Sequence, residues 1–289
     1  MRVKSRSSST WVSIESTCTM SVGISSSGLT SSRSGSSPSS TKAAPARLSA
    51  LAAAIDVELR RGRNPRRALK EKAYLKSDLE FLGVGLPFMR QAVRAVKQQH
   101  PGLDRGRLVA LVSILWSRPV FERRMMAVLL LEAFQPLLRP ADMKLLERLI
   151  RESKTWAFVD ELAIVIVGPL VERSPELRRV IDRWAVDDDF WLRRSAMLAL
   201  LRPLRRGEGD FTRFARYAEA MLDEREFFIR KAIGWVLRET AKKRPELIYR
   251  WLLPRCAVAS GVTVREAVKY LSSSQRANVL AAYASARGR

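Results

Sequence analysis

The chain has 289 residues, of which 47% are hydrophobic and 28% charged, so it can bury a substantial core and has a globular composition. Lysine and arginine number 52 against 29 acidic residues, which gives a formal net charge of +23. This surplus favours a polyanionic partner, because clustered cations release counterions from a phosphate backbone. Nucleic acid is therefore the first expectation, and a membrane surface or ribosomal RNA is the alternative.

Several classes of site lack the residues that they need. Two cysteines, Cys18 and Cys256, cannot make a zinc site by themselves, and a structural disulfide is not expected. The single histidine, His100, precedes Pro101, where a helix should end, so we interpret it as a surface cap. There is no Walker loop, no GxGxxG motif and no apolar run long enough for a bilayer. We expect no metal and no cofactor.

Residues 1–44 differ in composition from the rest of the chain. They contain 17 serines, five basic residues and one acid, and cannot bury enough apolar area to offset the entropy of ordering. We predict a disordered serine-rich tail over residues 1–44 and one folded domain over residues 45–289, which keeps +19 of the net charge. The tail fits an organelle transit peptide and, equally, an upstream extension from a misassigned start codon.

From about residue 46 the hydrophobic pattern is helical nearly throughout, without strand alternation. Ser77 and Glu80 in SDLE match a capping box, which predicts a helix start. Large polar-tipped residues recur at separations of 42, 40, 38 and 41 residues, namely Tyr74, Trp116, Trp156, Arg194 and Trp235. A period of roughly 40 predicts an all-α solenoid of HEAT-like antiparallel helix pairs, whose concave basic groove could hold a duplex.

Three segments carry candidate functional residues. In SKTWAFVDELAIVIVG, residues 153–168, Trp156 and Asp160 would share one helix face near the N-terminus, where the dipole favours an ionised carboxylate. A first-turn charge beside a core aromatic is the commoner reason for such a pair. In EFFIRKAIGWVLRETAKKR, residues 226–244, Trp235 lies off the apolar stripe between Lys231 and Arg238. This arrangement suits nucleic acid, and partial burial between repeats is the alternative.

The third segment, DDDFWLRRSAMLALL, begins at residue 187 with an acidic triplet. A carboxylate cluster could hold Mg²⁺ in a nuclease, but these acids occupy N-cap and first-turn positions and have no partner acid nearby, so we interpret them as capping residues. Arg194 could clamp a phosphate through two hydrogen bonds, or be a solvated flank residue.

Six segments in this order resemble the DNA alkylation repair enzymes, HEAT-like-repeat alkylpurine DNA glycosylases of the AlkD type. They are AYLKSDLEFLGVGLP (73–87), LWSRPVFERRMMAVLLLE (115–132), KTWAFVDELA (154–163), FWLRRSAMLALL (190–201), EFFIRKAIGWVLRE (226–239) and VREAVKYL (264–271). The resemblance covers roughly residues 65–270. Where the family has WWDxVD, this chain has Thr155 and Ala157 in place of the second Trp and the first acid.

The resemblance implies Asp160 as the catalytic carboxylate, with Trp156 and Trp235 flanking the damaged nucleotide. It further implies that Arg194 holds a phosphate and that Tyr74 is another aromatic of the cleft. Together with the pattern around Trp235, we expect a set of DNA-binding residues consisting of Arg194, Tyr74, Lys231, Arg238, Arg193 and Arg230.

The implied activity is that of a monofunctional DNA glycosylase, a hydrolase of base excision repair. It would release cationic N3- or N7-alkylated purines from double-stranded DNA, without a base-flipping pocket, as a monomer in the bacterial cytoplasm in association with the nucleoid. Two alternatives stay open. One is a non-catalytic HEAT-repeat protein that binds damaged or branched DNA. The other is a protein scaffold, for which +19 on the folded domain has no explanation.

Overall fold

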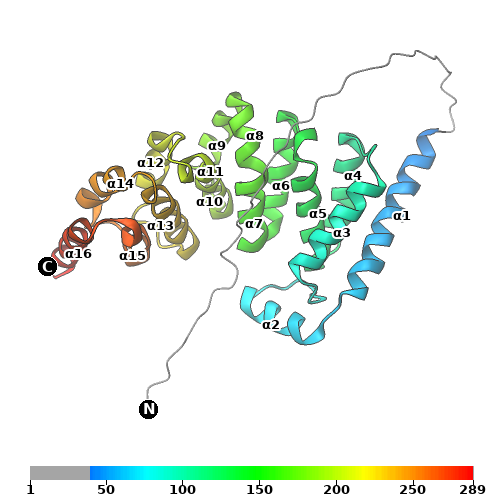
Figure 1. The fold of residues 1–289 in the computed structure, drawn as a ribbon, viewed down its shortest axis with the longest axis horizontal. Helices are drawn as coiled ribbons and strands as arrows, with labels where there is room; N and C mark the ends of the chain where they lie inside the picture. Colours follow the sequence, from blue (N-terminus) through cyan, green and yellow to red (C-terminus); the bar gives the residue numbers. More distant parts are fainter. Residues whose placement is uncertain (1–39, 289) are drawn as a thin grey trace. The chain divides into compact units, whose positions relative to one another are not determined.

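The computed structural model describes residues 40–288, and the side chains of residues 46–288, as a succession of helices from α1 to α16 (Figure 1). Within this range no β-strand occurs, and a single isolated bridge joins Glu80 to Val120. None of these helices is long and apolar enough to cross a membrane. The all-α prediction is confirmed; the predicted disorder of residues 1–44 falls almost wholly outside the described residues.

The repeated part of the fold has two rows of helices. The first row contains α5 (Phe121–Ala133), α7 (Trp156–Glu161), α10 (Phe190–Leu198), α13 (Phe227–Ala241) and α15 (Gly261–Ala267), and each of these helices contacts the next. The second row contains α4 (Arg105–Trp116), α6 (Met143–Ser153), α9 (Arg178–Trp184), α12 (Phe211–Ala220) and α14 (Pro245–Leu252). Each second-row helix packs against a first-row helix, as the solenoid prediction requires.

The remaining helices extend or connect these rows. They are α1 (Ser40–Arg61), α2 (Pro65–Leu75), α3 (Leu86–Gln99), α8 (Gly168–Arg173), α11 (Leu201–Arg205) and α16 (Ser273–Arg287). Short 3₁₀ turns lie at η1 (Gln135–Leu137), η2 (Pro140–Asp142), η4 (Pro175–Leu177), η5 (Leu253–Arg255) and η6 (Val268–Tyr270). A π-helical segment, η3 (Leu162–Val167), continues α7 into α8, and α3 packs on α5.

The repeat is shorter than the sequence suggested. First-row helices begin at residues 121, 156, 190, 227 and 261, so successive repeats are 34 to 37 residues apart. The predicted period of roughly 40 was wrong, because the residues chosen for it occupy unequal helix positions. Trp156 begins α7 and Arg194 is the fifth residue of α10, whereas Trp235 is the ninth residue of α13 and Trp116 ends α4 in the second row.

Local sequence explains where most helices begin. Side chains at eight N-caps accept a backbone N–H of the first turn: Asn64, Asp104, Thr155, Asp189, Asp210, Glu226, Ser260 and Ser272. His100 caps the C-terminus of α3, as expected. The predicted capping box at Ser77 and Glu80 is wrong, because no helix begins there. Instead, the backbone of Glu80 bonds to Pro119 and Phe121, which holds this connection in an extended form.

A buried carboxylate anchors the same connection to the first row. Glu122 of α5 is fully buried and accepts the backbone N–H groups of Leu82, Gly83 and Val84 at 2.9, 2.6 and 3.1 Å. Burial raises the pKa of Glu122, although these three hydrogen bonds oppose the rise. Gly83 has a φ of 77°, which an L side chain rarely adopts. The segment before α3 is therefore fixed on α5, close to α7.

Polar side chains also join residues one repeat apart. Arg194 binds Asp160 across 34 residues of sequence, and Lys231 binds Glu266 across 35. Arg206 binds Glu172 across 34 residues, and Arg151 binds Asp187 across 36. The apolar faces bury the core between the rows, and these ion pairs fix the register of neighbouring repeats.

Candidate catalytic and nucleic-acid-binding site

The candidate catalytic acid lies one turn into α7. Thr155 is the N-cap of this helix, and Lys154 before it has a φ of 49°, which turns the chain sharply out of α6. Trp156 is the first residue of α7 and Asp160 is the fifth, so their four-residue spacing places them on one face near the N-terminus. The helical placement that the sequence predicted for this pair is confirmed.

Asp160 forms a bidentate ion pair with Arg194 of α10. The guanidinium Nε donates to Asp160 Oδ1 at 2.7 Å and Nη2 donates to Oδ2 at 2.8 Å. The Asp160 side chain is 15% exposed, whereas Arg194 is only 3% exposed. Such fork-to-fork pairing fixes the plane of the carboxylate, because both oxygens are bound at once. Asp160 thus combines a fixed orientation with partial access to solvent.

A third hydrogen bond connects Arg194 to the next repeat. Its Nη1 donates to the backbone carbonyl of Phe228 in α13 at 2.6 Å, and its guanidinium carbon lies 6.0 Å from the centroid of the Phe228 ring. All three guanidinium nitrogens are thereby engaged within the protein. The predicted phosphate contact of Arg194 stays a prediction, and the geometry observed is that of a residue that positions Asp160.

Aromatic side chains surround the start of α7. Trp156 packs edge to face on Tyr74 of α2, with ring centroids 6.0 Å apart. The Trp156 side chain is partly buried, while Tyr74 is 62% exposed. Beneath them, Phe158 stacks on Phe121 at 4.8 Å in the core. The resemblance implied only that both aromatics belong to one cleft; the structure brings Tyr74 and Trp156 into contact and leaves Tyr74 open to solvent.

Trp235 of α13 is partly buried and packs against the hydrophobic core. Its indole nitrogen is buried without a hydrogen-bond partner among the described residues. Lys231 and Arg238 on either side of it both bind Glu266 of α15, Lys231 at 2.8 Å. Burial between repeats, the alternative weighed for Trp235, is therefore part of its environment, while Lys231 remains 42% exposed.

Glu266 of α15 binds three cations at once. Lys269 binds it at 2.9 Å in addition to Lys231 and Arg238, and we call these four residues the Glu266 cluster. Burial raises the pKa of Glu266, but the hydrogen bonds and charges of the three cations outweigh burial and lower the pKa to about 2. The cluster carries a net charge of +2.

The other two predicted DNA-binding arginines are largely engaged within the protein. Arg193 donates to the backbone carbonyls of Asp187 and Asp188 and forms an ion pair with Glu224 at 3.0 Å. Arg230 donates to the backbone carbonyl of Glu224. Both side chains tie the start of one first-row helix to the connection before it, and their predicted contacts with DNA stay predictions.

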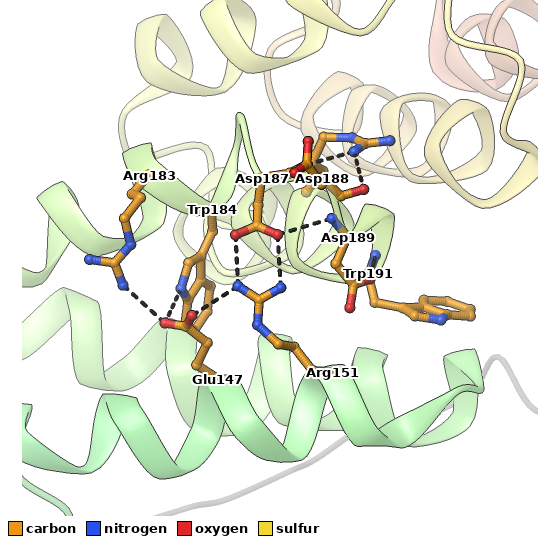
Figure 2. Close-up of polar contacts among 9 residues, drawn as sticks. Glu147, Arg151, Arg183, Trp184, Asp187, Asp188, Asp189 and Trp191 are labelled. Carbon is orange, nitrogen blue, oxygen red and sulfur yellow. Dashed lines mark hydrogen bonds and ion pairs between the residues drawn. The ribbon is translucent and has the colours of Figure 1, made fainter.

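The acidic triplet before α10 serves the protein's own structure (Figure 2). Asp189 is the N-cap of α10 and accepts the Trp191 N–H at 2.9 Å, which confirms its predicted capping role. Asp187 instead binds both terminal nitrogens of Arg151, at 2.8 and 2.7 Å, and these hydrogen bonds lower the pKa of Asp187. Among residues 40–288 there is no group of acids, histidines or cysteines arranged to hold a metal ion.

Sequence reasoning missed one cluster beside Asp160. Arg90 of α3 binds Glu132 of α5 at 2.9 Å and Glu161 of α7 at 2.8 Å, and we call these three residues the carboxylate triad. Burial raises the pKa of Glu161 to about 6; the charges of Glu132 and Asp160 add to the rise, and Arg90 opposes it. Arg90 and Glu161 are 71 residues apart in sequence. The available signal in the sequence was that a second acid, Glu161, directly follows Asp160.

Two surface hollows lie among the described residues. One, of about 350 Å³, is lined by Pro169, Glu172, Arg173, Arg202 and Arg206. The other, of about 240 Å³, is lined by residues of α1 and of the segments at 80–82 and 118–123. Neither hollow is lined by Trp156, Asp160 or Trp235.

Comparison with known proteins places this geometry in context. A family model described as DNA alkylation repair enzyme matches residues 55–271. The fold is similar to a solved structure described as a predicted DNA alkylation repair enzyme from Enterococcus faecalis, with a TM-score of 0.67 and 22% identity over 73% of this chain and 97% of the other. It is also similar to AlkD2 from Streptococcus mutans, with a TM-score of 0.52 and 18% identity over 71% and 100% of the two chains. No curated protein matches the sequence.

Proposed function

The chain belongs to the DNA alkylation repair enzyme family, and from this premise we propose that it is a monofunctional DNA glycosylase. Its substrates are purines alkylated at N3 or N7 in double-stranded DNA, and the reaction hydrolyses the N-glycosidic bond. The observation that supports this proposal best is Asp160, a partly exposed carboxylate held by Arg194 one helical turn from Trp156.

The charge of the substrate explains why one carboxylate suffices. Alkylation at N3 or N7 makes the purine cationic, so that it leaves readily with the electron pair of the C1′–N bond and becomes neutral. Positive charge then develops on the deoxyribose, water adds to C1′ and a proton is released. A preorganised carboxylate stabilises this oxocarbenium-like state by several kcal/mol in a poorly hydrated site. Electron-rich indole faces attract a cationic base by roughly 0.5 to 2 kcal/mol each.

Arg194 makes Asp160 suitable for this task by fixing its orientation. A carboxylate free to rotate would have to be ordered during the reaction, whereas the two bonds from Arg194 order it in advance. We therefore assign Arg194 as a positioning residue in the proposed reaction. The contacts of Arg194 with Asp160 and the Phe228 carbonyl use three of its five N–H donors, and the side chain is only 3% exposed, so burial is what limits a direct contact with a phosphate.

The duplex would lie along the first-row helices. Tyr74 and Lys231 are the most exposed of the predicted DNA-binding residues, and Trp156 lies against Tyr74. The Glu266 cluster offers a net positive charge to phosphates, which supply most of the affinity for DNA. We propose that the lesion is recognised by its charge and lability, without a deep base-flipping pocket. Uracil and hypoxanthine, which are neutral, should then be poor substrates.

Replacement of Asp160 by Asn tests the proposal. Asp160→Asn should abolish release of 7-methylguanine from methylated duplex, because the amide keeps the shape but loses the charge. Affinity for the duplex should stay within about twofold of the wild type. Release is measured by chromatography of freed bases. Asp142→Asn is the matched control, since Asp142 forms a similar two-pronged pair with Arg105 at 2.9 and 2.6 Å.

The outcomes separate the candidate functions. Unchanged release by Asp160→Asn refutes the proposed role of this residue. Wild-type binding to alkylated DNA without any freed base would instead support the non-catalytic DNA-binding protein. Absence of salt-dependent affinity for DNA would point to the protein scaffold, because phosphate contacts make binding steeply sensitive to salt.

A further inference from the structure

The carboxylate triad sets one cation against two carboxylates. Arg90 of α3 donates a hydrogen bond from one terminal nitrogen to Glu132 at 2.9 Å and another from the second terminal nitrogen to Glu161 at 2.8 Å. In residues 40–288 no other hydrogen bond or ion pair involves either carboxylate side chain. One guanidinium therefore serves two carboxylates, and the triad has a net charge of −1 when both are ionised.

This negative charge lies next to Asp160. Glu161 follows Asp160 directly in α7, and Asp160 already has Arg194 as its own partner. The pair Asp160–Arg194 is neutral as a unit, so the net negative charge beside Asp160 belongs to the triad. The triad thus carries a charge opposite to that of the domain as a whole, which is +19. A net negative charge at this position would repel a phosphate and attract a cation.

We propose that Glu161 is a specificity-determining residue, which together with Glu132 places one uncompensated negative charge beside Asp160 and thereby favours cationic over neutral nucleotides. This inference rests on the proposed function. The ligand class is a nucleotide that carries positive charge on its base or sugar. Glu161 need not touch this nucleotide, because an electrostatic interaction with a partly buried charge acts over several ångströms.

The same geometry makes the preference depend on pH. The charged groups that face Glu161 are Arg90 of α3, Glu132 of α5 and Asp160 of α7. Arg194 of α10 is bound to Asp160, η3 carries no charged residue, and on α6 Glu147, Arg151 and Glu152 bind partners elsewhere. With a pKa of about 6, Glu161 takes up a proton as the pH falls below neutrality, and the triad then becomes neutral.

The first test compares two synthetic duplexes. One carries a pyrrolidine abasic nucleotide, which is cationic, and the other carries the neutral tetrahydrofuran analogue. At pH 7.5 the wild type should bind the cationic duplex more tightly, and this preference should fall about threefold to tenfold in Glu161→Gln and in Glu132→Gln. Glu172→Gln is the matched control, because Arg206 likewise binds two glutamates, Glu172 of α8 and Glu208, but neither of them neighbours Asp160 in sequence. Its preference should equal that of the wild type.

The second test uses the pH profile of the preference between pH 5 and 8. In the wild type the preference should decline as the pH falls through about 6. Glu161→Gln should abolish this decline, and Glu132→Gln should move it to lower pH, because Glu161 then lacks its like-charged neighbour. A purely structural role of Glu161 predicts none of these shifts. Preferences in both acid variants equal to the wild-type value would overturn the proposal.

These measurements are independent of bond breaking. A wild type that prefers the cationic duplex but frees no base would refute the glycosylase proposal and leave the inference about Glu161 standing. A wild type that frees 7-methylguanine, with variants whose preference is unchanged, would refute the inference and leave the glycosylase standing. Equal binding of the two duplexes by the wild type would refute the inference in either case.

Discussion

Glu161 and Glu266 are both poorly exposed glutamates, with 15% and 11% of the side chain accessible, yet their chemistry differs. The pKa of Glu161 is raised to about 6, whereas that of Glu266 is lowered to about 2. Burial is the largest cause of the rise at Glu161, whereas at Glu266 three cations outweigh it. Glu161 shares a single arginine with a second carboxylate, while Glu266 binds three cations, of which Arg238 also binds Glu239.

The comparison shows how one solenoid can present opposite charges along its length. The carboxylate triad joins α3, α5 and α7, and the Glu266 cluster joins α13 and α15. In the proposed complex, the first would place negative charge beside a cationic nucleotide, and the second would place positive charge beside the phosphates. Between them along the first row stands the neutral pair Asp160–Arg194. A protein that binds a polyanion containing one cationic nucleotide needs both kinds of charge.

The largest expected effect comes from breaking the neutral pair between the two clusters. Arg194→Gln should lower the free energy of unfolding by about 3 to 5 kcal/mol, because a partly buried Asp160 would lose its counter-charge. Urea unfolding at pH 7 measures this loss. Arg151→Gln is the control, since Arg151 also binds both oxygens of one carboxylate, that of Asp187, through its two terminal nitrogens but is 40% exposed, and should cost about 1 kcal/mol or less. Equal losses in the two variants would contradict the role given to burial.

The next effect concerns the Glu266 cluster and acid. Because the folded-state pKa of Glu266 is depressed, its contribution to stability is present above the unfolded-state pKa and disappears as the pH falls towards 2. Glu266→Gln should cost about 2 kcal/mol at pH 7, and roughly half of that or less at pH 3. Urea unfolding of both proteins at the two pH values gives the comparison. A loss that is the same at pH 3 and pH 7 would show that packing, and not charge, explains the effect.

Glu161 should behave in the opposite sense. Its folded-state pKa is raised, so its own contribution to the free energy of unfolding should fall by up to about 2 kcal/mol as the pH rises from about 4 to 7. Glu161→Gln should remove this decline and be more stable than the wild type at pH 7. Parallel pH profiles for the two proteins would sink the assignment of an elevated pKa to this residue.

Local sequence patterns predicted most of what is local in the molecule. Helical periodicity, prolines and N-caps such as Asp189 gave an all-α fold, and the spacing of Trp156 and Asp160 placed both on one helix face. Local spacing failed where a tertiary contact decided the outcome. Ser77 and Glu80 match a capping box, but backbone bonds to the segment at 119–121 hold them in an extended connection.

Side-chain interactions between residues far apart in the chain could not be predicted from the sequence. Arg194 was expected to face a phosphate, and only the fold shows that Asp160, 34 residues away, occupies its guanidinium. The carboxylate triad is a stronger case, because its three residues come from three helices. The period was misjudged for a related reason, since residues of similar type were compared at unequal helix positions. A register based on helix starts would have aligned Asp160, Arg194 and Lys231, each the fifth residue of its helix.

The smallest expected effect tests whether DNA lies along the first row. Lys231→Ala removes a 42%-exposed cation of the Glu266 cluster, and Lys144→Ala removes an exposed cation from α6 in the second row. If the phosphates contact the first row, Lys231→Ala should weaken binding to undamaged duplex by about threefold and reduce the slope of log affinity against log salt by about one. Lys144→Ala should change neither quantity. The same net charge is removed in both variants, so equal effects would mean that the domain attracts DNA through its overall charge, and the contrast between the two clusters would then have no part in binding the backbone.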